Sequence, residues 1–141
     1  MRMNFNIKKT WWSPEDVTLV KKAIKFAAHR YGMKDLELNV KLGKPSEKYF
    51  GFSAYDDDLG FEIWIYPSDA LIRTVFHEMT HVKQQWYGEL NLNAPGAPRW
   101  KGKKCHKKYK NQPWEKEAHK MEVILAQEFS RISWLFAKFF I

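Results

Sequence analysis

The sequence contains a single cysteine, Cys105, among its 141 residues. One cysteine cannot form an intramolecular disulfide, which suits a reducing compartment. The chain also has no apolar run near the ~20 residues that a membrane span requires, and residues 1–10 contain no apolar stretch of signal-peptide length. We therefore expect a cytoplasmic protein without a membrane segment.

Acidic residues are scarce relative to basic ones, with 16 Asp and Glu against 24 Lys and Arg, a net charge of +8. The excess is concentrated in residues 99–110, from Arg99 to Lys110, which contain seven basic residues and no acidic one. Such a segment can attract nucleic acid or an acidic substrate, although a solvated basic loop is commoner. We expect at most a weak nucleic-acid contact here.

Core-forming residues are plentiful, since 45% of the chain is hydrophobic and it includes seven Trp and ten Phe. A chain of this length buries about two thirds of its surface when it folds as one unit. The sequence shows no internal repeat and no low-complexity segment. We expect a single domain that spans residues 1–141.

The first half of the chain predicts one helix followed by three strands. Ser13 as N-cap and Pro14 in the first turn predict a helix that runs to about Tyr31 and is ended by Gly32. Apolar and polar residues alternate from 36 to 42, which is typical of a half-buried strand. The pattern predicts two further strands over residues 49–55 and 61–66.

The second half predicts two helices separated by a long loop. We expect residues 67–69 to cap a helix that runs to about Tyr87, with Gly88 as its stop. Prolines, glycines and the basic residues predict an irregular loop over 89–112. Pro113 should begin the last helix, and the aromatic end of the chain should join a core or a subunit contact.

The sequence His77-Glu78-Met79-Thr80-His81 carries the strongest chemical signal. Two imidazoles four residues apart on a helix project from one face and can bind one metal ion, for which zinc is the best match. The intervening Glu78 can then act as a general base toward a metal-activated water. Both histidines fall away from the apolar stripe of this helix, so they are poor core residues, although a solvated helix face remains an alternative.

A catalytic zinc typically has three protein ligands and one position left for water. The metzincin pattern requires Gly at position 84 and His at 87, whereas this chain has Gln84 and Tyr87. The last predicted helix offers Glu115 and Glu117 instead. At about 100° per residue, the two glutamates lie about 80° to either side of that helix's apolar stripe, so helical geometry alone does not choose between them.

The segments HEMTH, VKQQWYGEL and PWEKEA, with Tyr109 between the last two, resemble the small gluzincin-type zinc metallopeptidases of the ImmA/IrrE-like and phage-encoded groups. The resemblance spans about residues 68–125. It implies an α+β, zincin-like fold, in which an N-terminal helix and a small, mainly antiparallel sheet pack on the HExxH helix, which is followed by a glutamate helix.

The resemblance also implies roles for individual residues. His77 and His81 would bind zinc, and Glu78 would be catalytic. Relatives read Glu-x-x-Ala-Asp/Asn, and alignment on Ala118 selects Glu115 as the third ligand, with Glu117 as the alternate. His119 then stands at the polar position that orients a metal-bound histidine.

The expected function is that of a zinc-dependent peptidase, a gluzincin-type endopeptidase, that hydrolyses peptide or protein substrates. An extended substrate would pair with an exposed sheet edge, and Tyr109 or His106 would stabilise the oxyanion. One alternative is a SprT-like, DNA-associated protease in which His106 is the third ligand. Another is a non-catalytic, zinc-stabilised module that binds a peptide or a partner.

Overall fold

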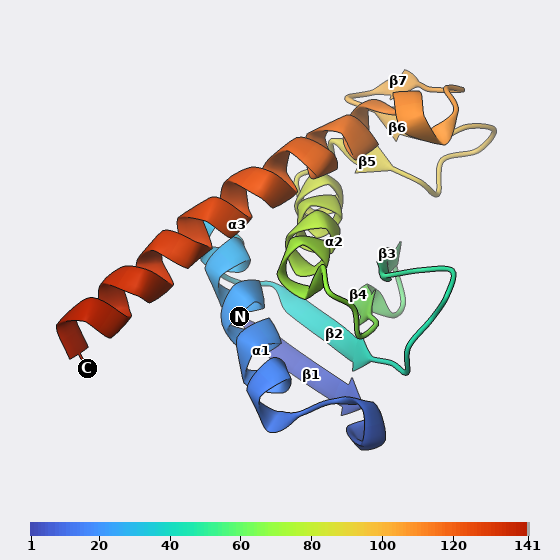
Figure 1. Cartoon of the computed structure of the whole chain (residues 1–141). Helices are drawn as coiled ribbons and strands as arrows, with labels where there is room; N and C mark the ends of the chain where they lie inside the picture. The colour runs from blue at the N-terminus through green and yellow to red at the C-terminus, as the bar shows by residue number, and fades with distance from the viewer. Residues whose placement is uncertain (141) are drawn as a thin grey trace.

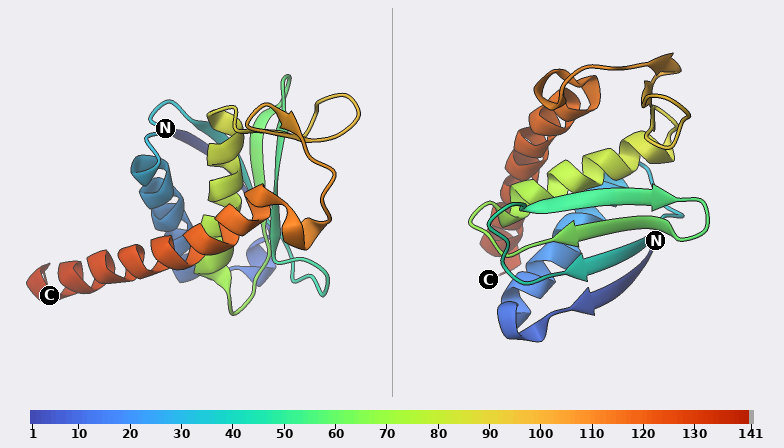
Figure 2. Two further views of the ribbon diagram at one scale, coloured as in Figure 1. Left: turned by 90° about the horizontal axis from the view of Figure 1, so that it is seen from above. Right: turned by 90° about the vertical axis from the view of Figure 1, so that its right-hand side faces the viewer.

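The structure is a computed structural model that describes residues 1–140, and it describes their side chains except for those of residues 9, 110 and 133–140. It has α+β architecture, with the helices on one face of a four-stranded sheet (Figures 1 and 2). The main elements in chain order are β1 (Arg2–Ile7), α1 (Pro14–Arg30), β2 (Glu37–Leu42), β3 (Gly51–Asp56), β4 (Gly60–Ile65), α2 (Leu71–Trp86) and α3 (Pro113–Phe140).

The sheet is mixed, so the prediction that it is mainly antiparallel was wrong. Its strand order is β1-β2-β4-β3, and only β3 and β4 pair antiparallel, while β1 pairs parallel with β2 and β2 parallel with β4. The error has two sources: β1 was not predicted, and β4 lies between β2 and β3, so that β2 pairs parallel with β4. The chain returns through α1 between β1 and β2, and such a crossover makes the two strands parallel.

The three strands that the sequence did predict lie within about two residues of their expected bounds. β2 shows the expected alternation, with Leu38, Val40 and Leu42 buried against the helices. β3 lies at the edge of the sheet, where it pairs with β4 alone. One long edge of β3 therefore has no strand beside it.

The first helix begins as its sequence predicts. The Ser13 side chain accepts a hydrogen bond from the backbone N–H of Asp16 at 3.1 Å, and Pro14 occupies the first turn. The buried face of α1 packs on the sheet and on α2 through apolar residues that include Val20, Ala23, Ile24, Ala27 and Ala28.

The start of α2 differs from its prediction. Its N-cap is Ala70, and no side chain caps the helix, because the Ser68 hydroxyl instead accepts from the N–H of Ala70. The end is as predicted, with Tyr87 as C-cap followed by Gly88 at φ 73°. Val75, Phe76, Met79 and Val82 are fully buried, so they fix the rotation of α2 on the sheet.

Residues 89–112 are more ordered than predicted. They contain a small antiparallel sheet, in the order β5-β6-β7, and a short 3-10 helix before α3. Each strand has only two residues, too few for a periodic pattern to reveal. The elements are β5 (Leu90–Asn91), β6 (Arg99–Trp100), β7 (Lys103–Lys104) and η2 (Tyr109–Asn111).

The long helix α3 crosses α2 and continues past the rest of the molecule (Figure 1). Trp114, Ala118 and Leu125 are buried, whereas Ile132 is 53% exposed. Among the described side chains, the predicted apolar stripe therefore meets the core as far as Phe129. The expected contact of the aromatic end, residues 134–141, lies outside the side chains that the structure describes. Among the described residues, no helix has both the length and the apolar composition to cross a membrane.

Candidate metal centre

His77, His81 and Glu115 meet between α2 and α3. Nε2 of His81 lies 3.2 Å from Nε2 of His77 and 2.6 Å from Oε1 of Glu115, and the same carboxylate oxygen is 3.1 Å from Nε2 of His77. Two ligands about 2.0–2.1 Å from a tetrahedral zinc are themselves about 3.3 Å apart. Two of the three separations are therefore close to this value. Among the described residues this is one of two groups that could hold a metal ion, the other being His77, His119 and Glu122.

The hydrogen-bond partners of the two Nδ1 atoms indicate which nitrogen of each imidazole carries the hydrogen. Nδ1 of His81 faces the amide oxygen of Gln84 at 2.8 Å, and Nδ1 of His77 faces a carboxylate oxygen of Glu122 at 3.3 Å. Both oxygens are acceptors, so each Nδ1 carries the hydrogen and each neutral ring has its lone pair on Nε2. Both Nε2 atoms thus face one carboxylate oxygen, an arrangement that protons on Nε2 or a metal ion bound by the neutral rings can stabilise.

Gln84 is fully buried, and the surroundings of its amide group determine its orientation. Its nitrogen donates to the backbone oxygen of Trp114 at 2.9 Å and to the carboxylate of Glu117 at 3.1 Å. The amide oxygen must therefore face His81. Sequence reasoning used position 84 only to exclude metzincins, although its place three residues after His81, on the same helix face, was a usable signal.

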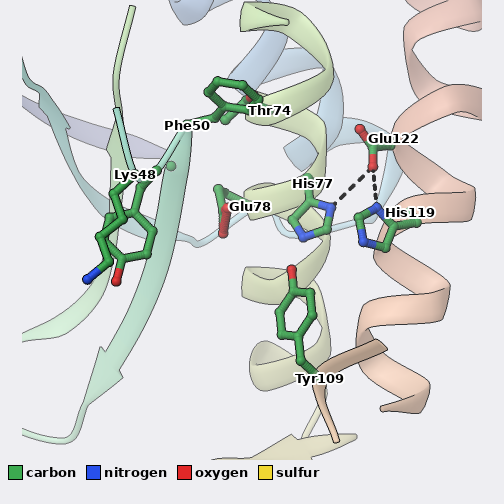
Figure 3. Close-up of a pocket in the computed structure, with 10 residues that line it drawn as sticks. Lys48, Phe50, Thr74, His77, Glu78, Tyr109, His119 and Glu122 are labelled. Carbon is green, nitrogen blue, oxygen red and sulfur yellow. Dashed lines mark hydrogen bonds and ion pairs between the residues drawn. The ribbon is translucent and has the colours of Figure 1, made fainter. Parts of the chain in front are cut away.

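The group that orients His77 is Glu122, which the sequence prediction missed. Its Oε1 contacts Nδ1 of His77 and also Nδ1 of His119 at 2.8 Å, as Figure 3 shows. Arg73 holds the other oxygen of this carboxylate at 3.3 Å. That His119 orients a metal-bound histidine stays a prediction: its ring packs on the ring of His77, with centroids 4.7 Å apart, and its Nδ1 contacts Glu122. The spacing Glu115–Glu122, two helical turns, was the available signal.

The two candidate glutamates point to different places. Glu115 is buried against both histidines, whereas the Glu117 carboxylate lies 3.3 Å from Nζ of Lys83 and contacts Gln84. The same lysine is bound to Glu89 at 2.7 Å. The structure thus separates two residues that helical geometry left equivalent.

In the metal-free protein, Glu115 and the two histidines also shift each other's pKa values. Burial alone would raise the pKa of Glu115, but hydrogen bonds from His77 and His81 outweigh burial and hold that pKa well below its usual range. Burial would likewise lower the pKa of both histidines, yet the hydrogen bond to Glu115 and the negative charge of that carboxylate raise each pKa above 6.5. In the metal-free protein, protons on His77 and His81 therefore stabilise this cluster by hydrogen bonding to Glu115.

Glu78 lies beside the histidines, between α2 and β3 (Figure 3). It is 6% exposed, and burial raises its pKa to about 7. Gly51 of β3 makes this position possible, since a Cβ there would lie 3.3 Å from Cγ of Glu78 and 2.8 Å from both the Thr74 side chain and the Trp64 backbone oxygen. The strand and the glutamate therefore approach closely only because residue 51 is glycine.

Tyr109 lies in η2, and its phenol points toward His77 (Figure 3). Burial, with the negative charge of Glu115, raises its pKa to about 12, so the phenol stays protonated and can donate a hydrogen bond. His106, the other predicted oxyanion donor and the alternative third ligand, is exposed. It belongs to neither metal-binding group of the described residues.

A groove runs along β3 past the candidate centre as two adjoining cavities of about 260 and 300 Å³. Gly51, His77, Glu78 and Tyr109 line both. Each is at or below the lower end of the ~300–1,000 Å³ range for small-molecule sites, a size that suits one or two side chains.

The basic segment, residues 99–110, is exposed over most of its length. Lys101 lies over the ring of Trp100, and Arg99 donates to the backbone oxygen of Gly102. Among the described side chains of this segment, none forms an ion pair with a described acidic residue. A nucleic-acid contact here stays a prediction.

The chain matches no protein-family model, and no curated protein or solved structure matches it. The evidence for a function therefore comes from the residues of the site and their geometry.

Proposed function

We propose that the chain is a zinc-dependent peptidase of the gluzincin type, in which His77, His81 and Glu115 hold the metal. The observation that carries this proposal is the convergence of two imidazole Nε2 atoms and one carboxylate oxygen within 3.2 Å of one another. A zincin-like fold is part of the same proposal. Its support is the packing of the sheet on α2 and the crossing of α3 that brings Glu115 to the histidines.

The donor set suits zinc. Two neutral nitrogens and one carboxylate are the ligand set of catalytic gluzincin sites, and three protein ligands leave one position for water or substrate. Zinc, when bound, supplies Lewis acidity that polarises a peptide carbonyl and acidifies water. Gln84 and Glu122 hold the imidazoles in the tautomer that binding requires.

Glu78 acts as the general base. Its buried carboxylate lines the groove next to both histidines, close to where a peptide carbonyl would lie. A pKa of about 7 in the metal-free protein is close to the value that favours proton transfer at neutral pH. A bound cation would lower this pKa and favour the carboxylate form. Glu78 then takes the proton of the attacking water and returns it to the leaving nitrogen.

The substrate lies along the free edge of β3. The backbone N–H of Tyr66 donates to the oxygen of Phe50, which marks residues 50, 52 and 54 as those bonded to β4. Gly51, Ser53 and Tyr55 therefore direct their N–H and C=O groups away from β4. An extended peptide satisfies such groups by adding as a strand, and the protonated phenol of Tyr109 is available to stabilise the oxyanion.

The test is reconstitution. Protein stripped of metal with a chelator should not cleave a mixed peptide library, and titration with zinc should restore hydrolysis in proportion to bound metal, up to one zinc per chain. Zinc binding without hydrolysis would identify a non-catalytic metal-stabilised module. Hydrolysis that persists in the metal-free protein would refute the proposal.

A further inference from the structure

One end of the groove is closed. Asn93, in the loop after β5, donates from Nδ2 to the backbone oxygen of Tyr55 near the end of β3, at 3.2 Å. The ring of the same Tyr55 packs on Phe61, with centroids 4.5 Å apart, and Phe61 packs on Trp86, with centroids 5.8 Å apart. The third outward-facing carbonyl of β3 is therefore occupied, and aromatic rings fill the space between the strand end and α2.

The other end is open. It is lined by Lys48 and Phe50, of which Phe50 is 60% exposed, while Tyr49 lines both cavities. Among the described residues, no hydrogen bond or ion pair joins residues 44–50 to α3. The Asn93 hydrogen bond occupies the strand edge at one end of the groove, and the described residues 44–50 leave the other end without such a bond to α3, so the groove is asymmetric about the candidate centre.

The closed half has room for only a few residues. Gly51 lies next to Glu78, and Tyr55 is four residues further along the strand, about 13 Å at ~3.3 Å per residue. That length accommodates about three residues of an added strand. The walls of this half include Leu90, Leu92 and Trp114, which favour an apolar substrate side chain.

Strand direction indicates which end of a peptide fits. An antiparallel partner of β3, the slightly more stable arrangement, has its amino-terminal side at the Asn93 end. The two carboxylates that line the closed half, Glu78 and Glu115, belong to the candidate centre itself, so strand direction alone sets the expected orientation of the substrate.

We infer that the enzyme removes fragments of about three residues or fewer from the amino terminus of its substrates, an inference that rests on the peptidase function proposed above. The reaction is hydrolysis: the C–N bond breaks, the water oxygen bonds to the carbonyl carbon, and the released nitrogen receives a proton. Asn93 and Leu92 set the length limit.

The test uses zinc-loaded protein and a mixed library of synthetic peptides about 14 residues long, with fragments identified by mass spectrometry. We expect cleavage after the first three positions to exceed interior cleavage at least tenfold. Cleavage spread evenly along the peptides, or clustered at the carboxyl end, would overturn the inference while leaving the peptidase function intact. No cleavage by zinc-loaded protein would refute both.

Variants test the cause of the limit. Two groove variants should each raise interior cleavage at least tenfold. The first combines Leu92→Ala with Asn93→Ala. The second is the near-isosteric Asn93→Asp, which sets a carboxylate against the Tyr55 oxygen. The matched control is Asn4→Ala, whose amide bonds Asn39 on the outer face of the sheet. Asn4→Ala should keep the wild-type pattern. Retention of that pattern in both groove variants would show that Asn93 does not close the groove.

Discussion

The amide oxygen of Gln84 lies 2.8 Å from Nδ1 of His81, and Gln84 is fully buried between α2 and α3. The hydrogen on Nδ1 leaves the lone pair of Nε2 free, directed at Glu115. A buried glutamine thus sets the tautomer of a proposed zinc ligand. Its own orientation depends on the start of α3, through the Trp114 carbonyl and Glu117.

Replacement of Gln84 by methionine should therefore weaken zinc binding. Methionine has a similar volume but offers no strong acceptor, so the His81 ring loses the group that fixes its tautomer. We expect a ~10 to 100-fold higher Kd for zinc, measured by competition with a chromophoric chelator. Gln127→Met, on the exposed face of α3, is the matched control and should bind zinc as the wild type does. Equal affinities for the two variants would exclude this role for Gln84.

Glu115→Ala and Glu117→Ala should differ sharply in a zinc titration. Removal of Glu115 deletes a proposed ligand and should weaken binding far beyond 100-fold, because that loss exceeds the effect of a group that only orients a ligand. Glu117 touches Gln84 and Lys83 but neither histidine. Its removal should change the Kd by about tenfold or less. The reverse ranking would make Glu117 the third ligand.

Zinc affinity should fall as the pH is lowered. Both histidines have pKa values raised above 6.5 in the metal-free protein, so they hold protons at a higher pH than ordinary histidines do. Zinc must displace those protons. Below the raised pKa values the Kd should therefore increase by up to ~100-fold per pH unit, and well above them it should level off. A Kd that is constant between about pH 5.5 and about pH 8 would contradict this.

Gly51→Ala should impair hydrolysis more than zinc binding. The new methyl group would lie 2.8 Å from a backbone oxygen of β4 and close to Glu78, so β3 must shift away from the general base. We expect a loss of about 1–3 kcal/mol in the free energy of unfolding and a reduced kcat, with zinc affinity retained. Gly43→Ala, which meets only the Tyr66 ring, is the comparison and should keep its kcat. Equal kcat values for the two variants would argue against this role for Gly51.

The sequence predicted elements whose signals are local. Ser13 and Pro14 begin α1 because capping depends on adjacent residues, and the spacing of His77 and His81 put both imidazoles on one helix face. The strand β1 was missed although Met3, Phe5 and Ile7 alternate with polar residues and pack on the core. That omission accounts for one of the two parallel pairs, and the other arises because β4 lies between β2 and β3 in the sheet.

Features set by contacts between elements could not be predicted in the same way. Glu115 and Glu117 are equivalent on an isolated helix, and only the placement of α3 beside Lys83 and Gln84 separates them. The role of Glu122 likewise depends on its distance from His77, 45 residues earlier in the chain. The closure of the groove depends on Asn93 and Tyr55, 38 residues apart and in different elements.

The substitution Glu78→Gln tests the account most directly, when zinc content and peptide hydrolysis are measured on the same samples. The amide keeps the shape of the side chain but cannot accept a proton from water. Glu37→Gln, on the exposed surface of β2, is the matched control. We predict that both variants keep about one zinc per chain and that only Glu78→Gln loses hydrolysis, by at least ~100-fold. Hydrolysis by zinc-loaded Glu78→Gln at the wild-type rate would contradict the proposed mechanism.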